Sequence, residues 1–334
     1  MKQSSNKNIV CIGGGTGTFV VLKGLKEFYT NLSAIVTMSD SGGSNKRIRD
    51  EFGLLPTSDI RQCLVALSSE NGGAGLLRKL FMYRFEKGQG ISGMTFGNLF
   101  MAALSDILGS QEEAIRQTGK VLNIKGQVIP VSFTDTNLVA EYEDGTTISG
   151  EHFIDEPPHD GKTKITNIYL TPHAIANPEA CQAIEMADLI VLGPGDLYTS
   201  LVPNLLVKGI SDSLKQSNAK KAYILNLMTK SGQTYGYKAS DHLNVVESYT
   251  GRVDSVVLHV GEFPANALEV YKKYNEFPVE DDLGGDLRVV RGDIVNRNII
   301  TKSHSDSLVR SLIRHDSTRL AALLIDMVET RMNV

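Results

Sequence analysis

Residues 8–17, with the sequence NIVCIGGGTG, decide the fold of this chain. A run of four apolar residues enters a turn that consists of Gly13, Gly14, Gly15, Thr16 and Gly17. An apolar run that breaks into glycines and leads into a helix is typical of a buried strand in a parallel sheet. The next residues keep helical spacing to about Phe28, and residues 33–38 (SAIVTM) predict a second strand. The N-terminus therefore predicts a strand–helix–strand unit with parallel strands.

The rest of the chain repeats this rhythm, with two interruptions. Apolar runs predict strands at residues 165–170, 189–192, 222–227, 253–260 and 287–290, and helices at 265–274 and 317–332. We expect an α/β fold with a Rossmann-like, doubly wound and mainly parallel sheet, in a single domain of residues 1–330. The interruptions are predicted insertions, one helical at about 70–125 and one β-rich at 126–164. The second contains a hairpin turn at Asp144-Gly145 and ends in a polar linker at 155–164.

The composition excludes several classes of protein. Of 334 residues, 41% are hydrophobic and 22% charged, which is ordinary for a globular protein. A formal net charge of −4 argues against a nucleic-acid partner, because phosphate-backbone contacts need a concentrated basic surface. Three scattered cysteines predict buried free thiols in a reducing compartment. With neither a signal core nor an apolar run long enough for a membrane helix, we expect a cytoplasmic protein without a membrane partner.

Polar turns recur where the predicted strands end. They are GGGTG at residues 13–17, SDSGGS at 39–44, GPGDLYTS at 193–200 and NLMT at 226–229. In doubly wound sheets the carboxyl ends of the strands border the ligand crevice. A glycine turn lets the backbone approach phosphate oxygens, and the helix that follows attracts an anion with its first N–H groups. The pattern predicts a site for a phosphate-bearing ligand, most simply a nucleotide; the alternative is that the glycines only allow close helix packing.

Each further candidate has a structural alternative. Asp40 stands where a Rossmann fold places an acid on a ribose, but its loop also fits an ordinary solvated turn. Asp59 lies where a residue can cap a helix, and Asn98 suits either a base or sugar contact or a cap. The candidates for nucleotide or phosphate binding are Gly13, Gly14, Gly15, Thr16, Gly17, Ser41, Gly42, Gly43, Ser44, Arg61, Asn98, Gly193, Gly195, Asp196, Tyr198, Thr199, Ser200 and Asn226.

Several familiar motifs are missing. In G-x-G-x-x-G spacing the third glycine would fall on Thr18 or Val20, which argues against a nicotinamide dinucleotide. No Gly-Lys-Ser/Thr sequence follows the first turn, and Ser200 does not lie in a G-x-S-x-G elbow. The seven histidines show no metal spacing, and Asp316 is expected to cap the last helix. No cofactor is firmly predicted; any Mg²⁺ would use Asp40 or Asp59 together with ligand phosphates.

Five motifs occur in a characteristic order. After GGGTG and SDSGGS come SDIRQCL at residues 58–64 and TFGNL at 95–99, and GPGDLYTS follows. In this combination the chain resembles, over residues 8–327, a superfamily that contains 2-phospho-L-lactate transferase and the bacterial gluconeogenesis factors. It looks more like the gluconeogenesis factors. Ser41 replaces an acid and Ser58 replaces a glycine of the usual pattern, and loss of the second acid weakens the transferase interpretation.

The resemblance implies two alternative functions. The first is a regulatory protein that binds UDP-N-acetylglucosamine or a related UDP-sugar and links gluconeogenic growth and cell shape through an unknown protein partner. The second is a transferase of the 2-phospho-L-lactate type, with a nucleotide diphosphate donor, Mg²⁺, and Asp40 or Asp59 in catalysis. A nicotinamide oxidoreductase would rest on fold analogy alone. The base, uracil or guanine, and the oligomeric state stay open, a homodimer being one alternative.

Overall fold

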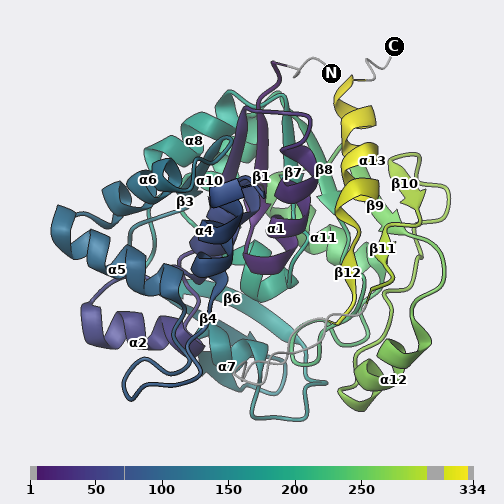
Figure 1. Cartoon of the computed structure of the whole chain (residues 1–334). Coiled ribbons are helices and arrows are strands. Elements are labelled where there is room, and N and C mark those ends of the chain that lie inside the picture. The colour runs from purple at the N-terminus through teal and green to yellow at the C-terminus, as the bar shows by residue number, and fades with distance from the viewer. Residues whose placement is uncertain (1–5, 71, 299–311, 330–334) are drawn as a thin grey trace.

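A seven-stranded sheet forms the centre of the molecule (Figure 1). The computed structural model describes residues 6–70, 72–298 and 312–329. The strand order is β10-β9-β8-β7-β1-β2-β3, and every neighbouring pair is parallel. The strands are β1 (Ile9–Gly13), β2 (Leu32–Val36), β3 (Gln127–Pro130), β7 (Leu189–Leu192), β8 (Lys220–Ile224), β9 (Ser255–His259) and β10 (Val289–Gly292). All residues of β1 and β7 are buried, as expected for a parallel sheet with both faces covered. The predicted fold class is confirmed.

The strand order changes direction between β1 and β7. From β1 the chain adds β2 and β3 on one side, and later adds β7 to β10 on the other. The loops that follow β1 and β7 therefore diverge from a topological switch point. Open α/β sheets bind their ligands in the crevice at this point.

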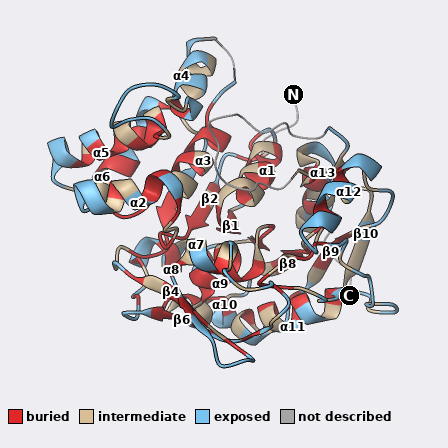
Figure 2. Cartoon of the chain, turned by 90° about the horizontal axis from the view of Figure 1, so that it is seen from below, coloured by how far each residue is buried: buried red, intermediate tan, exposed pale blue. Residues whose placement is uncertain are grey.

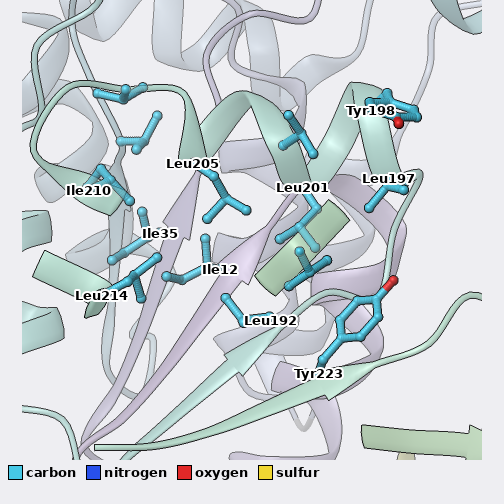
Figure 3. Close-up of a cluster of buried hydrophobic side chains, with 14 of the residues drawn as sticks. Ile12, Ile35, Leu192, Leu197, Tyr198, Leu201, Leu205, Ile210, Leu214 and Tyr223 are labelled. Carbon is cyan, nitrogen blue, oxygen red and sulfur yellow. The ribbon is translucent and has the colours of Figure 1, made fainter. Parts of the chain in front are cut away.

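Helices cover the two faces of the sheet. One face, with alternate residues such as Cys11 and Ala34, packs under α1 (Gly15–Leu25), α3 (Ser58–Leu67) and α13 (Ser317–Glu329). The other, with Ile12 and Ile35, packs against a second set of elements and a small sheet (Figure 3). That set comprises α8 (Pro178–Glu185), the π-helical turn η1 (Leu197–Leu201), α9 (Val202–Leu205), α10 (Ile210–Gln216) and α11 (Ala239–Thr250). Further out lies α12 (Ala265–Lys273).

The predicted helical stretch lies beside the β2–β3 end of the sheet (Figures 1 and 2). Within the predicted bounds of 70–125 it consists of α4 (Gly72–Met82), α5 (Phe96–Leu108) and α6 (Gln111–Val121). The helices α2 (Gly43–Phe52) and α3, which precede these bounds, pack beside it. Its core includes Phe81, which packs against Phe96 and Phe100 with ring centroids 5.8 and 5.0 Å apart. Within the described part of the chain, no helix has both the length and the apolar character needed to cross a membrane.

The β-rich segment differs from the expected insertion at both ends. β3 joins the parallel sheet beside β2, whereas the predicted strand at 165–170 is β6 (Ile165–Thr171) in a separate antiparallel sheet. That sheet has the order β5 (Thr147–Ser149), β4 (Asn137–Tyr142), β6, and β4 and β5 meet at the expected Asp144-Gly145 hairpin. β6 contains exposed residues on one side, which suits a sheet with one solvated face. The supposed linker follows a short helix, α7 (Glu151–Asp155).

The remaining predicted elements differ mainly at their ends. β8 begins two residues before the expected strand, and β10 begins two residues after it. The strands β11 (Val295–Asn296) and β12 (Arg314–His315) form a two-stranded antiparallel ladder that lacks a clear sequence signal. Asp316 caps the last helix as expected, because its Oδ1 accepts the N–H groups of Thr318 (3.0 Å) and Arg319 (2.9 Å). The expected end of that helix at residue 332 lies outside the described residues. Of the cysteines, Cys11 and Cys63 are buried and Cys181 is half-buried.

Candidate functional site

The turn after β1 has a conformation and surroundings that only glycine fits. Gly15 has φ +51°, in the left-handed region. A Cβ on Gly17 would collide with the carbonyl oxygen of Pro194, so the turns after β1 and β7 pack directly on each other. α1 begins here without an acidic residue in its first turn and without a side-chain cap on Gly14. The positive end of the helix dipole is therefore directed at the switch point, where it attracts an anion.

The turn after β7 is fixed by two asparagines. The Asn226 side chain, which follows β8, donates from Nδ2 to the carbonyl oxygen of Gly195 at 2.8 Å. Asn204 of α9 donates from Nδ2 to the carbonyl oxygens of Gly13 (3.3 Å) and Ser200 (2.9 Å). Asn204 is fully buried, and its two hydrogen bonds connect the turn after β1 with the turn after β7. A π-helical turn, a feature common at functional sites, follows Asp196 here.

The start of α3 lies against the same glycine turn. The two carboxylate oxygens of Asp59 are 2.6 and 3.0 Å from the positions that Cβ atoms would take on Gly14 and Gly15. From the turn itself, Thr16 donates its hydroxyl to Gln62 Oε1 at 3.3 Å. Asp59 is thus placed to accept a hydrogen bond from a hydroxyl group of a ligand bound over the turn.

The loop after β2 is held by its own side chains. Asp40 accepts the N–H of Gly42 at Oδ1 (2.8 Å) and the side-chain amide of Asn45 at Oδ2 (2.5 Å). The Ser41 hydroxyl accepts the N–H of His152 in α7 at 3.1 Å, and the N–H of Ser41 donates to Glu151 Oε2 at 3.4 Å. The carboxylate of Asp40 therefore shapes the loop, and Ser41 fastens α7 to it.

Asn45 and Asn98 connect this loop to α3 and α5. Asn45 Oδ1 accepts the N–H groups of Thr57 (3.3 Å) and Ser58 (3.2 Å), so a side chain of α2, and not Asp59, accepts the N–H groups at the start of α3. Asn98 is fully buried; its Nδ2 donates to Ser44 Oγ (3.2 Å) and Ser58 Oγ (3.1 Å). Its Oδ1 accepts from Arg61 Nε at 3.0 Å. The cap of α5 is Thr95, whose hydroxyl accepts the N–H of Asn98.

Carboxylates line one side of the site. Glu151 and Asp155 are the first and last residues of α7, four residues apart and so on one face of the helix. Burial raises the pKa of Glu151 well above its usual value, and the charges of Asp40, Asp155 and Asp59 raise it further. Burial also raises the pKa of Asp155 to about 6; Lys230 opposes the rise, and Asp196 adds to it. We call these five carboxylates, Asp40, Asp59, Glu151, Asp155 and Asp196, the acidic wall.

Lys230 places a positive charge beside the acidic wall. Its Nζ is 3.6 Å from Asp155 Oδ1 and 3.7 Å from Glu276 Oε1. Burial lowers the pKa of Lys230, but the charges of Asp155, Asp196 and Glu276 outweigh this and raise it above its usual value. Burial raises the pKa of Glu276 to about 7, against the effect of Lys230. Carboxylates thus outnumber this ammonium group, which leaves this side of the site acidic.

The structure distributes the predicted residues between the site and its support. It brings together the two glycine turns, Asp59, Ser200 and Asn226 at the switch point. Tyr198 and Thr199 are buried: the Tyr198 hydroxyl shares a hydrogen bond with Tyr237 (3.0 Å), within the hydrophobic cluster of Figure 3. Thr199 and the N–H of Tyr198 both contact Gln233. Arg61 and Asn98 are buried in the support of the second loop. Direct ligand contacts by these four residues stay predictions.

Several residues of the site were not singled out by the sequence. They are Gln62, Glu151, Asp155, Lys230, Gln233 and Glu276. For α7 a signal exists, since two acids four residues apart flank the apolar pair of Phe153 and Ile154. Lys230 and Gln233 lie in the loop between β8 and α11, and Glu276 lies in the loop after α12. They reach the site through tertiary contacts, for which local sequence gives no sign.

The residues present fit Mg²⁺ only in company with a ligand. Both oxygens of Asp40 are already hydrogen-bonded within its loop. Across residues 6–70, 72–298 and 312–329, no three His, Cys, Asp or Glu side chains form a group that could hold a metal ion. Mg²⁺ commonly takes one or two carboxylates and completes its shell with phosphates and water. Asp59, beside the glycine turn, fits that role; the metal roles of Asp40 and Asp59 stay predictions.

Comparisons with known proteins agree with this architecture. The family model of 2-phospho-L-lactate transferase CofD matches residues 9–300. A putative gluconeogenesis factor from Aquifex aeolicus is 41% identical over 335 residues, covering 97% of this chain and 98% of the relative. The gluconeogenesis factor of Bacillus subtilis is 38% identical over 324 residues, covering 96% and 98%.

A solved structure is also similar. A Bacillus halodurans protein described as a member of the UPF0052 family superposes with a TM-score of 0.85 at 38% identity, covering 97% of this chain and 100% of that one. The match of fold, motifs and sequence extends over nearly the whole chain. The chain therefore belongs to the 2-phospho-L-lactate transferase CofD family, among relatives named gluconeogenesis factors.

Proposed function

We propose that this protein is a cytoplasmic regulatory factor that binds a nucleoside-diphosphate sugar of the UDP-N-acetylglucosamine type. Its occupancy would link gluconeogenic growth and cell shape through a protein partner. The observation that carries the proposal is the meeting of two glycine turns, after β1 and β7, beside the acidic wall at the switch point of the sheet. In this proposal the glycine turns bind the diphosphate, and the acidic wall binds the sugar.

The diphosphate is assigned to the glycine turns because they offer backbone rather than side chains. The positive end of α1 is directed at this point, and its first turn contains no acid. Gly15 and Gly195, with φ +51° and +154°, have backbone conformations that glycine adopts readily and other residues rarely adopt. Backbone N–H groups at a helix start bind phosphate oxygens without regard to the rest of the ligand.

The sugar is assigned to the acidic wall because carboxyl groups accept hydrogen bonds from hydroxyl donors. A hexose presents several hydroxyl donors and no charge, so it can donate to Glu151 and Asp155 without electrostatic cost. A ligand with a carboxylate at this position would meet like charges, which raises the cost of binding. Burial is the main cause of the raised pKa values of Glu151 and Asp155, and the neighbouring carboxylates Asp40 and Asp196 add to it, so a further negative charge would be unfavourable here.

This argument favours the binding protein over the transferase. The 2-phospho-L-lactate group carries a carboxylate as well as a phosphate, and the transferase reaction would place this carboxylate beside the acidic wall. Asp40, one of the two catalytic candidates, has both oxygens engaged in its loop, and Ser41 stands where the transferase pattern has an acid. The family match over residues 9–300 supports the transferase as the alternative, with Asp59 orienting the attacking hydroxyl and Mg²⁺ stabilising phosphoryl charge.

Titration calorimetry tests the proposal. UDP-N-acetylglucosamine should bind with a dissociation constant in the micromolar range, about −8 kcal/mol, and UDP-glucuronate should bind at least about tenfold more weakly. The Asp155→Asn variant should narrow that difference at pH 8, above the Asp155 pKa of about 6, and the exposed Glu280→Gln should leave it unchanged. No heat and no thermal shift with UDP-sugars at millimolar concentration would refute the proposal. Turnover of lactyl-diphosphoguanosine that Asp59→Asn abolishes would establish the transferase instead.

A further inference from the structure

The outer face of α4 is unusually apolar for a surface helix. Leu76, Leu80 and Tyr83, which follows the helix directly, are 71%, 40% and 52% exposed. The opposite face is packed in the ordinary way, since Phe81 is fully buried against the aromatic rings of α5. Single exposed apolar residues are common on proteins, but here Leu76 and Leu80 lie one turn apart on α4 and Tyr83 follows directly after it. Tyr83 makes an edge contact with the ring of Phe85, at 5.2 Å between centroids, and much of its side chain is still exposed. Packing within the chain therefore does not explain this stripe of three residues.

The spacing of the stripe matches a helix-packing seam. Leu76, Leu80 and Tyr83 are separated by four and then three residues, the interval of alternating d and a positions in a heptad. Such a seam packs against the apolar face of one further helix. In Figure 2, α4 stands at the edge of the molecule, with exposed residues along it.

The charges around the stripe are predominantly basic. α4 contains Arg78 and Lys79 and no acidic residue. Arg78 is held by Glu70 at 3.2 Å and lies over the ring of Phe19, so it belongs to the fold. Lys79 is exposed, flanks the stripe, and forms no ion pair with any residue that the structure describes. Its place corresponds to a g position, where a partner helix would present an opposite charge.

We propose that the outer face of α4 docks an acidic amphipathic helix of another protein. The apolar face of that helix would pack on Leu76, Leu80 and Tyr83, and an acidic side chain would pair with Lys79. A second copy of this chain fits poorly, because two α4 helices would bring basic residues together without an acid between them. An anionic membrane fits poorly as well, since the short helix offers one unpaired lysine and the whole chain has a net charge of −4.

A designed peptide tests the charge and the seam together. The probe is a labelled helical peptide of about three heptads with Leu at a and d and Glu at the remaining positions. A second peptide has Lys in place of Glu. By fluorescence anisotropy the acidic peptide should bind at least about tenfold more tightly than the basic one. The double variant Leu76→Ser, Leu80→Ser should bind the acidic peptide at least about tenfold more weakly than the wild type. Lys79→Glu should reduce the ratio of the affinities for the acidic and the basic peptide.

Ile107→Ser provides the matched control. Ile107 is 76% exposed on α5, outside the stripe, so its loss should leave the affinity unchanged. Circular dichroism and thermal melting confirm that each variant folds. The proposal is overturned if the acidic peptide does not bind at 1 mM, if both peptides bind equally, or if Lys79→Glu has no effect. Self-association or binding to anionic vesicles that the Leu76→Ser, Leu80→Ser double variant abolishes would also overturn it.

Discussion

The turn after β1 and the loop after β2 follow neighbouring strands but are built in different ways. The first is fixed by its backbone, because Gly17 fits only without a side chain against Pro194. The second is fixed by side chains, because Asp40, Asn45 and Ser41 bond to its own backbone and to α3 and α7. A Cβ on Gly43 would meet no atom within 4 Å, and one on Gly42 would make only ordinary contacts at 3.4 Å or more, so this loop lacks the tight backbone contact of Gly17.

The difference indicates a division of roles. A backbone-built turn recognises phosphate whatever the ligand carries elsewhere. The loop after β2 is built by side chains, and Asn45, Asn98 and Ser41 join it to three helices. Such a loop can respond to the part of the ligand beyond the phosphates. We therefore expect the first turn to determine affinity and the second loop, with α7, to determine selectivity.

The largest effect is expected from Gly17→Ala. The new methyl group would collide with the carbonyl oxygen of Pro194 and force the turns after β1 and β7 apart. We expect a loss of about 3 kcal/mol in the free energy of unfolding, together with loss of nucleotide binding. Urea titration and calorimetry measure both. Gly284→Ala, where a Cβ meets no neighbour, should change neither the stability nor the nucleotide affinity. A Gly17→Ala protein that is as stable as the wild type and still binds nucleotide would contradict the proposed difference between the two loops.

Asn98→Ala should have the next largest effect, through the second loop. It removes a fully buried side chain that bonds to Arg61, Ser44 and Ser58. The expected loss is about 2 to 3 kcal/mol, because buried polar partners lose their hydrogen bonds. Asn31→Ala, at an exposed side chain, serves as the control in the same denaturant series. A loss below about 0.5 kcal/mol would show that the loop does not depend on its side chains.

A pH series sharpens the picture of the carboxylates around Lys230. The pKa of Glu276 is raised to about 7, so the folded protein keeps a proton that the unfolded chain releases near pH 4. The stability contributed by this group is therefore present at low pH and is lost as the pH rises through 7. Buried His242 and His315, with pKa values lowered to about 4, act in the opposite direction between about pH 4 and 6.5.

Comparison with Glu276→Gln isolates the glutamate from these histidines. Between pH 5 and 8 the unfolding free energy of the wild type should fall by about 2 kcal/mol relative to the variant. Glu280→Gln, at a mostly exposed side chain, should show no such pH-dependent difference. A constant difference for Glu276→Gln across the series would mean that Glu276 is charged throughout.

The smallest effect is expected from Ser41→Ala. It removes the acceptor for the N–H of His152 and loosens the attachment of α7, at a cost of about 1 kcal/mol. Ser248→Ala, which loses an exposed hydroxyl bond to Val245, should cost less. Equal losses in thermal unfolding would show that Ser41 contributes no more than an ordinary surface serine.

The sequence predicts the central architecture because its signals are local. Buried parallel strands leave apolar runs, as in β1 and β7, and the polar turns at their ends follow directly. The Asp316 cap and the Asp144-Gly145 hairpin depend on neighbouring residues and were predicted correctly. β3 and β6 were assigned to the wrong sheets, because a short β-run does not specify its partner.

The acidic side of the site was missed in part for a related reason: Asp40, Asp59 and Asp196 were among the candidates, but Glu151 and Asp155 were not. Asp155 was placed in a polar linker, although with Glu151 it forms one face of a short helix. Lys230 and Glu276 meet 3.7 Å apart but lie 46 positions apart in the chain, as the difference of their numbers shows. Such contacts are set by tertiary packing, which no sequence window contains. The turn that we propose to bind phosphate consists of contiguous residues, 13–17, so its pattern could be recognised in the sequence.

The structure of a complex tests the central claim most directly. Crystals of the protein would be soaked with UDP-N-acetylglucosamine and, separately, with GDP. The account predicts that the diphosphate of the UDP-sugar lies over residues 13–17 and against the turn at Gly193 and Gly195, with sugar hydroxyls donating to Glu151 or Asp155. A diphosphate bound away from both glycine turns, or a site that accepts GDP and excludes the UDP-sugar, would contradict it.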